Sequence, residues 1–233
     1  MNIDGTTKLF GIIGNPVAHS LSPAMHNAAF GACGLNHVYV PFQVSDVQAA
    51  LAGLVALGVS GVSVTIPHKQ RIIEYLDAVD PVAAAIGAVN TIVIDHRQGG
   101  IARGSNTDWV GANRALQDHI ELSGARVTLI GAGGAARAIA FGLQEAGARI
   151  TIASRNETAG RELAEAVGGG WLSLTRCGAE AAADILINAT SVGMEPQQDQ
   201  SPVISNVLDR FKVVMDIVYA PAASRSKCVR RGA

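Results

Sequence analysis

The sequence predicts an α/β protein of two domains, each built around a mainly parallel sheet. Short runs rich in Val and Ile alternate with longer stretches rich in Ala and Leu, as expected for successive β–α units. The pattern changes after a helical segment at residues 106–121, which we interpret as a link between domains at residues 1–105 and 122–233. A length of 233 residues is sufficient for two small domains with separate cores.

The composition favours a globular protein of a reducing compartment. Hydrophobic residues make up 48% of the chain and charged residues 16%, which disfavours disorder. The formal net charge of −1 predicts no attraction to nucleic acid or to an anionic membrane. Cys33, Cys177 and Cys228 are far apart, so we expect no metal cluster. Without an apolar leader or a run long enough to cross a bilayer, the chain is predicted to be cytoplasmic.

The first half is expected to contain short strands and two capped helices. Ser22 and Pro23 have the order of an N-cap followed by proline at the first helical position, and Gly34 would end this helix. A second helix is expected from Ser45 to Gly58. Strands are expected at residues 9–13, 37–40, 61–65, 91–95 and 101–104.

A glycine-rich loop follows the first strand of the second half. The strand at residues 126–130 runs directly into Gly131-Ala132-Gly133-Gly134-Ala135-Ala136, which opens a helix. In this G-x-G-x-x-A pattern, Gly131 permits a tight turn, Gly133 lets the backbone approach a pyrophosphate, and Ala136 permits close helix–strand packing. The N–H groups at the helix start suit phosphates. The second half is therefore predicted to be a Rossmann domain that binds a dinucleotide.

The end of the next strand, residues 149–153, indicates which dinucleotide binds. An NAD domain would present Asp or Glu there to the ribose hydroxyls, whereas this chain presents Ser154-Arg155-Asn156. An arginine at this point can pair with a 2′-phosphate, although an ordinary surface arginine is the alternative. We therefore expect NADP(H). The last strand is expected at residues 213–218.

Polar residues gather at strand ends and helix starts of the first half. Two hydroxyls at a helix start suit a carboxylate ligand, although capping would also explain Ser22. A lone lysine is usually a solvated charge, and amides at these places also serve as turn and cap residues. Beside a dinucleotide site, however, the set suits a polyhydroxylated acid and an acid–base group. Its members are Ser20, Ser22, Ser63, Thr65, Lys69, Asn90, Asn106 and Asp108.

Six motifs, in order along residues 10–221, resemble the shikimate dehydrogenase family. Any one of them alone would be unspecific, whereas six in the family's order are specific. They are Gly14-Asn15-Pro16 with His19-Ser20, Ser22-Pro23 and His26-Asn27; Val64-Thr65 with Pro67 and Lys69; Gly87-Ala88-Val89-Asn90-Thr91; Asn106-Thr107-Asp108; Gly131-Ala132-Gly133-Gly134-Ala135; and Asn188-Ala189-Thr190-Ser191 with Gly193-Met194.

The resemblance implies NADP-dependent, reversible reduction of 3-dehydroshikimate to shikimate, in the biosynthesis of chorismate and aromatic amino acids. Lys69 and Asp108 would form the catalytic pair, with no metal ion, in a monomer or homodimer. The substrate would contact Ser20, Ser22, Ser63, Thr65, Asn90, Asp108 and Tyr219. NADP(H) would contact Gly131, Ala132, Gly133, Gly134, Ala135, Ser154, Arg155, Asn156, Thr190 and Ile217.

The chain departs from the family pattern at two places. Ser63 stands where most members have Asn, which predicts a changed fit at the substrate hydroxyls. Beyond Pro221 the family continues with a glycine-rich turn, a glutamine that contacts the substrate, and a closing helix. Residues 224–233 include four basic residues and no helical apolar stripe, so we expect a shortened or altered C-terminus.

Three alternatives stay open at this point. The chain could oxidise quinate as well as shikimate, if the additional hydroxyl of quinate fits near Ser20 and Ser22. It could be a catalytically impaired ligand-binding relative, which the C-terminus favours and the retained Lys69 and Asp108 disfavour. A two-domain folate dehydrogenase would share the architecture, but the paired serines fit it poorly.

Overall fold

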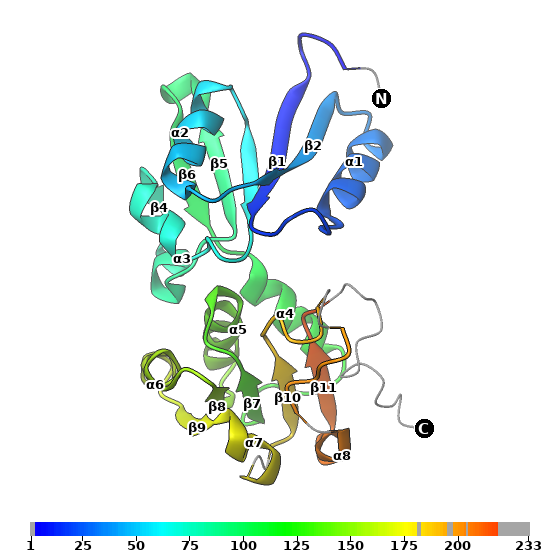
Figure 1. The fold of residues 1–233 in the computed structure, drawn as a ribbon, viewed down its shortest axis with the longest axis vertical. Coiled ribbons are helices and arrows are strands. Elements are labelled where there is room, and N and C mark those ends of the chain that lie inside the picture. Colours follow the sequence, from blue (N-terminus) through cyan, green and yellow to red (C-terminus); the bar gives the residue numbers. More distant parts are fainter. Residues whose placement is uncertain (1–2, 181–182, 195–197, 204, 219–233) are drawn as a thin grey trace. The chain divides into compact units, whose positions relative to one another are not determined.

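The computed structural model describes residues 3–180, 183–194, 198–203 and 205–218, in two compact units (Figure 1). The first unit is Met1–Thr107 and the second is Asp108–Ala233. The boundary therefore falls immediately before the helix that begins at Asp108, so that this helix belongs to the second unit. None of the helices formed by these described residues is both long and apolar enough to span a membrane.

The first unit has a six-stranded sheet in the order β2-β1-β3-β5-β6-β4. β1 pairs in parallel with β2 and β3, and β4 pairs in parallel with β6. β5 is antiparallel to both β3 and β6. β5 and β6 form a hairpin that turns through Gly99 and Gly100, whose φ angles are +80° and +89°. The strands are β1 (Lys8–Gly14), β2 (His37–Gln43), β3 (Gly61–Val64), β4 (Ala78–Val79), β5 (Thr91–Asp95) and β6 (Ile101–Ser105).

The helices of the first unit begin differently from the sequence prediction. Ser22 is the first residue of its helix, not the N-cap; Leu21 occupies the N-cap position and makes no side-chain cap bond. The next helix is capped by Asp46 rather than Ser45, since the Asp46 carboxylate accepts from the N–H groups of Gln48 and Ala49, at 3.0 and 3.1 Å. The helical segments are α1 (Ser22–Ala32), α2 (Val47–Ala56), α3 (Pro81–Ile86) and the 3₁₀ segments η1 (Arg71–Tyr75) and η2 (His96–Gln98).

The second unit has a fully parallel sheet in the order β11-β10-β7-β8-β9, which confirms the predicted Rossmann-type architecture. From β7 the chain proceeds outward to β8 and β9, then returns to β10 and β11 on the other side of β7. The strands are β7 (Arg126–Ile130), β8 (Arg149–Ser154), β9 (Gly170–Ser173), β10 (Ile185–Asn188) and β11 (Val213–Asp216). The helices are α4 (Asp108–Gln117), α5 (Gly134–Glu145), α6 (Glu157–Ala166), α7 (Leu174–Glu180) and α8 (Ser205–Leu208).

Helix α4 is shorter than the expected link at residues 106–121 and packs against α5. The Trp109 ring meets Phe141 edge-on, with 5.8 Å between centroids, and Asn113 Nδ2 donates to the Gly142 carbonyl at 2.7 Å. A side chain at Gly142 would collide with the Trp109 carbonyl and with Asn113, so the close approach of the two helices depends on this glycine.

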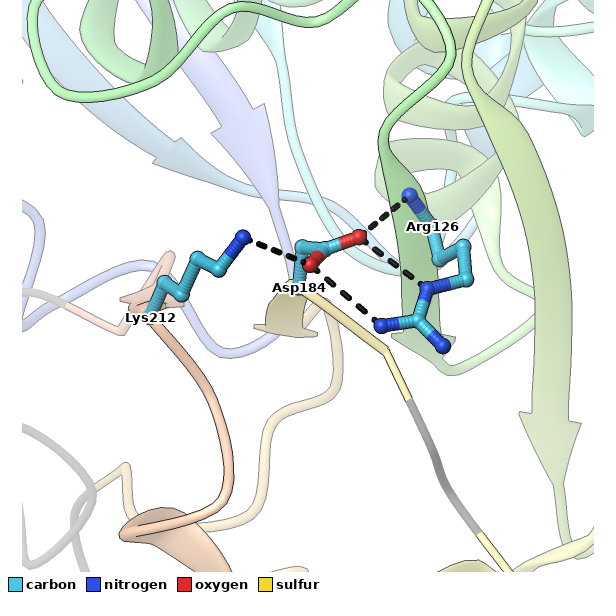
Figure 2. Close-up of polar contacts among 3 residues, drawn as sticks. All are labelled: Arg126, Asp184 and Lys212. Atoms are coloured by element: carbon cyan, nitrogen blue, oxygen red, sulfur yellow. Dashed lines mark hydrogen bonds and ion pairs between the residues drawn. The ribbon is translucent and has the colours of Figure 1, made fainter.

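A cluster of ion pairs joins the beginnings of three neighbouring strands, β7, β10 and β11, in the second unit (Figure 2). Asp184, just before β10, accepts from Arg126 Nε at 3.2 Å and from the Arg126 backbone N–H at 3.1 Å. Lys212 Nζ, just before β11, lies 3.1 Å from the same carboxylate. Hydrogen bonds from Arg126 are the main reason why the pKa of Asp184 lies well below its ordinary value of 3.8.

Asp184→Asn is expected to lower the free energy of unfolding at neutral pH. Since the folded-state pKa is depressed, the stabilisation is fully present above the ordinary pKa of 3.8 and is lost as the pH falls through the folded-state pKa. Urea denaturation should therefore show a smaller difference between parent and variant at about pH 3 than at neutral pH. Replacement of the exposed Asp209 by Asn is the control. If the free energies of unfolding of parent and Asp184→Asn differed as much at about pH 3 as at neutral pH, the ionised Asp184 carboxylate would not be the source of the stabilisation.

Candidate functional site

The loops after β7, β8, β10 and β11 lie at one edge of the parallel sheet, because the carboxyl ends of parallel strands share an edge. The strand order reverses at β7, so that a crevice for a ligand is expected beside its carboxyl end. The residues predicted to contact the dinucleotide are on these loops, at the adjoining helix starts or, for Ser154, at the last position of β8. They are Gly131, Ala132, Gly133, Gly134 and Ala135 after β7; Ser154, Arg155 and Asn156 at the end of β8; Thr190 after β10; and Ile217 after β11.

The glycines of the β7 loop have separate roles. Gly131 is buried with a φ of +118°, and a side chain there would meet the Ala189 carbonyl oxygen at 2.9 Å. Its N–H donates to the Ala153 carbonyl at 2.9 Å, so the turn touches the ends of both neighbouring strands. Gly133 is exposed, and a side chain there would meet no atom within 4 Å. The structure thus leaves open space over Gly133 at the helix start.

The start of α5 fits a pyrophosphate. Gly133 is the N-cap in extended conformation and has no side chain with which to cap the helix. The first intrahelical bond runs from the Arg137 N–H to the Gly133 carbonyl, which leaves the N–H groups of residues 134–136 directed out of the helix end. Fully buried Ala136 lets α5 approach the sheet closely. This cradle could hold the diphosphate of a dinucleotide.

The turn at the end of β8 presents Arg155 to solvent between two fixed neighbours. Ser154 is only 4% exposed, and its hydroxyl donates to the Asn156 carbonyl at 2.7 Å. The Asn156 side chain accepts from the Ala159 N–H at 3.1 Å and caps α6. In the described part of the chain, Arg155 takes part in no ion pair. Its guanidinium is therefore the group of this turn that can meet a phosphate.

Asn188, the first residue of the sixth motif, fixes the loop after β10, a structural role that the motif alone did not predict. Its side chain is 3% exposed, donates to the Val192 carbonyl and Asp216 carboxylate, each at 3.1 Å, and accepts from the Thr190 hydroxyl at 2.7 Å. The Asn188 carbonyl accepts from the Ile217 N–H at 3.1 Å. Asn188 therefore holds the loop after β10 against the end of β11. A polar residue at the end of an otherwise buried apolar strand was the available signal.

In the first unit, backbone hydrogen bonds hold the loop that carries Lys69. The Lys69 carbonyl accepts from the Val89 N–H at 2.8 Å, and the Thr65 N–H donates to the Ile13 carbonyl at 2.9 Å. His68, 5% exposed, makes a 2.7 Å contact between its Nε2 and the Val44 carbonyl. Lys69 itself is half-buried. The loop thus joins β1, the end of β2 and the segment that leads into β5.

Asn90 lies where three of the predicted motifs meet. Its carbonyl accepts from the Val64 N–H at 2.8 Å, and its own N–H donates to the Ser105 carbonyl at 3.0 Å. The side-chain Oδ1 accepts from the Thr107 N–H at 3.0 Å, and Nδ2 donates to the Thr107 hydroxyl at 3.0 Å. Asn90 is consequently fixed beside the residue that directly precedes Asp108 in the chain.

The hydroxyls near α1 and β3 are also anchored. The Ser20 hydroxyl accepts from the Ser22 N–H at 3.3 Å, which places both serines at the start of α1. The Tyr39 hydroxyl donates to Ser63 at 2.7 Å, and the Tyr39 backbone exchanges two hydrogen bonds with the Asn27 side chain, at 2.8 and 2.9 Å. Tyr39 was not predicted from the sequence to support Ser63, because its partners are distant along the chain.

The remaining predicted substrate contacts are Asp108 and Tyr219. Asp108 is half-buried and is the first residue of α4, where a carboxylate favours the helix N-terminus. Tyr219, predicted to contact the substrate, lies outside the described residues, as does the C-terminal segment at 219–233.

Comparisons with known proteins agree in both units. Residues 12–92 match the family described as "Shikimate dehydrogenase substrate binding domain", and residues 112–217 match "Shikimate / quinate 5-dehydrogenase". The chain belongs to the shikimate dehydrogenase family. Family members named shikimate dehydrogenase (NADP(+)) include one from Thermococcus kodakarensis, 44% identical over 95% of this chain and 81% of the relative. Another, from Methanothermobacter thermautotrophicus, is 46% identical over 94% of this chain and 80% of the relative.

Solved structures of the shikimate dehydrogenase family have the same fold. One shikimate dehydrogenase in complex with NADP+ superposes with a TM-score of 0.87, at 40% identity over 97% of this chain and 82% of that chain. The Thermus thermophilus enzyme in complex with NADP(H) and shikimate gives a TM-score of 0.80, at 36% identity over 92% of this chain and 80% of that chain. Family membership, expected from the motifs, is thereby confirmed, and NADP(H) is the cofactor that the names of these relatives give.

Gly131 and Gly133 should respond differently to substitution by alanine in this family member. Gly133→Ala is expected to leave thermal stability nearly unchanged but to weaken NADP+ binding by about tenfold or more, because the methyl group enters the space over the helix start. Gly131→Ala should destabilise the fold by about 1–3 kcal/mol, because of its φ angle and the Ala189 carbonyl. Calorimetric titration and thermal melts measure both effects. Unchanged NADP+ affinity in Gly133→Ala would contradict this location of the pyrophosphate.

Proposed function

We propose that the chain catalyses the NADP-dependent, reversible reduction of 3-dehydroshikimate to shikimate, a step in the biosynthesis of aromatic compounds. One observation carries the proposal: a loop suited to a dinucleotide in the second unit accompanies anchored hydroxyl and amide groups and the half-buried Lys69 in the first, within a chain of the shikimate dehydrogenase family. Relatives named shikimate dehydrogenase (NADP(+)) align with nearly the whole chain.

The reaction requires a proton donor on the protein. Bound NADPH supplies the hydride that adds to the C3 carbonyl of the substrate. Negative charge then develops on the carbonyl oxygen, and the Lys69 ammonium group both stabilises this charge and gives the oxygen its proton. Asp108 holds Lys69 in place, and once the oxygen has been protonated, the Asp108 carboxylate accepts a hydrogen bond from the new hydroxyl. In the oxidation direction, Lys69 takes the proton back.

The anchored polar groups of the first unit bind the acid. Ser20 and Ser22 hold its carboxylate at the start of α1, where the N–H groups of the helix favour an anion. Ser63, Thr65 and Asn90 meet its alcohol groups. Because the Tyr39 hydroxyl already donates to Ser63, the Ser63 hydroxyl is left to donate its own proton to a substrate oxygen. Tyr219 completes the predicted contacts.

The second unit selects the cofactor through Arg155, which pairs with the 2′-phosphate that distinguishes NADP(H) from NAD(H). Gly131 to Ala135 would hold the pyrophosphate, and Thr190 and Ile217 would also contact NADP(H). We further propose that the protein acts in the cytoplasm on a small-molecule substrate, without nucleic acid or membrane partners, as a monomer or homodimer.

Quinate is the second candidate substrate, because the family description that matches residues 112–217 names both acids. Quinate carries one more hydroxyl, which would have to fit beside Ser20 and Ser22. Turnover of the two acids with NADP+ and NAD+ under equal conditions decides between a shikimate enzyme and one of broader specificity. NADPH and shikimate binding without any turnover would instead favour the catalytically impaired relative.

Lys69→Ala is expected to reduce kcat for NADPH formation from shikimate by roughly 10²–10⁴-fold, because the proton donor is lost. The affinity for NADP+ should be unchanged, since the dinucleotide loops are in the other unit. Lys8→Ala, which removes an exposed lysine from β1, is the matched control and should retain parental kcat. Near-parental turnover in Lys69→Ala would remove Lys69 from the mechanism.

A further inference from the structure

We propose that Trp171 is a positioning residue for NADP selectivity, which acts by fixing the Ser154–Asn156 turn that presents Arg155. Trp171 lies on β9, at the edge of the sheet and 16 residues beyond Arg155 in the chain. The inference rests on the proposed pairing of Arg155 with the 2′-phosphate. No motif in the sequence pointed to Trp171.

A chain of two hydrogen bonds connects Trp171 to both sides of Arg155. The indole Nε1–H donates to the Ser154 hydroxyl at 2.9 Å, and this hydroxyl donates to the Asn156 carbonyl at 2.7 Å. The Ser154 hydroxyl thus acts inside the protein, and its single proton is committed to the turn. Since Ser154 is only 4% exposed, its polar atom needs these partners. The indole N–H therefore orients the hydroxyl that closes the turn around Arg155.

The register and the close packing of α6 leave this arrangement little freedom. β9 pairs with β8 so that Trp171 lies opposite Ile152, two residues before Ser154. A side chain at Gly160 of α6 would collide with the Ser154 hydroxyl and the indole nitrogen of Trp171. The Gly160 N–H also donates to the Asn156 carbonyl, at 3.1 Å. The turn is thus held by β9 on one side and by α6 on the other.

Arg161, which lies against Trp171, already has an aromatic and an acidic partner. The Arg161 guanidinium lies over the indole ring, with Cζ 4.4 Å from the ring centroid, and Arg161 Nε pairs with Glu157 at 2.8 Å. Arg155, by contrast, is exposed and takes part in no ion pair among the residues that the structure describes. Arg161 therefore has a structural role, stacked on Trp171, whereas the Arg155 guanidinium is exposed and can bind a phosphate.

A positioning role makes a prediction that a purely structural role does not. NAD(H) has no 2′-phosphate, so its affinity does not depend on where Arg155 points. Loss of the indole hydrogen bond should consequently weaken NADPH binding and spare NADH binding. General loosening of the domain would weaken the binding of both dinucleotides alike, because they share the pyrophosphate cradle.

Trp171→Phe is the decisive variant, because it keeps an aromatic ring under Arg161 and removes only the N–H donor and part of the ring. We expect the Kd for NADPH, measured by titration of nicotinamide fluorescence, to rise about 3- to 10-fold, with the Kd for NADH unchanged. Ser154→Ala, which removes the acceptor of the indole hydrogen bond with little change of volume, should likewise raise the Kd for NADPH relative to the Kd for NADH. Trp109→Phe, at the other tryptophan of the chain, is the control and should leave the ratio of the two Kd values unchanged.

The same titrations in an Arg155→Ala background distinguish the inference from its premise. Arg155→Ala should abolish most of the preference for NADPH, and Trp171→Phe should then have no further effect on the ratio. An unchanged ratio in Arg155→Ala alone would overturn the proposed role of Arg155. A second outcome would overturn the positioning role of Trp171 but not the role of Arg155. In this outcome Arg155→Ala reduces the preference for NADPH, whereas Trp171→Phe and Ser154→Ala either leave the preference unchanged or weaken the binding of both dinucleotides equally.

Discussion

Parallel pairing of β7 with β8 on one side and β10 on the other is the constraint on which the cofactor site depends. It brings loops that are distant in the sequence to the same edge of the sheet. Gly131 shows how tight this convergence is, since its N–H bonds to the end of β8 while its α-carbon faces the Ala189 carbonyl after β10. At the opposite ends of the strands, Asp184 joins Arg126 and Lys212. The strand ends are thus fixed at one edge of the sheet by charge and at the other by close packing around Gly131.

In the first unit, a mixed sheet likewise brings loops that are distant in the sequence close together. Hydrogen bonds hold the loops that carry its polar residues: the Lys69 carbonyl accepts from the Val89 N–H, and Asn90 bonds to β3 and β6 through its backbone and to Thr107 through its side chain. Such bonds fix where each loop begins and ends while the side chains remain half-buried. The chemistry proposed for Lys69 requires this combination, because a proton donor must be positioned within hydrogen-bond reach of one particular substrate oxygen.

The sequence predicted the features whose signals are local. The glycine loop, the start of α5 and most strands are encoded within a few neighbouring residues, and the structure has them within one to three residues of the expected bounds. Asp46 replaced Ser45 as a cap because both residues suit that position and only the backbone conformation decides. The two-residue strand β4 is too short to show a periodicity. The partners of Ser154 and Ser63, namely Trp171 and Tyr39, are 17 and 24 residues away, so that local patterns contained no sign of them.

Direct transfer of hydrogen between the acid and the nicotinamide is the central claim of this account. Shikimate that carries deuterium at C3 is incubated with the protein and NADP+, and the NADPH that forms is analysed by NMR. We expect deuterium in the nicotinamide ring of NADPH, because the roles proposed for Lys69 and Asp108 concern only the hydroxyl proton. NADPH without deuterium, or NADP+ and shikimate that bind without forming any NADPH, would contradict it.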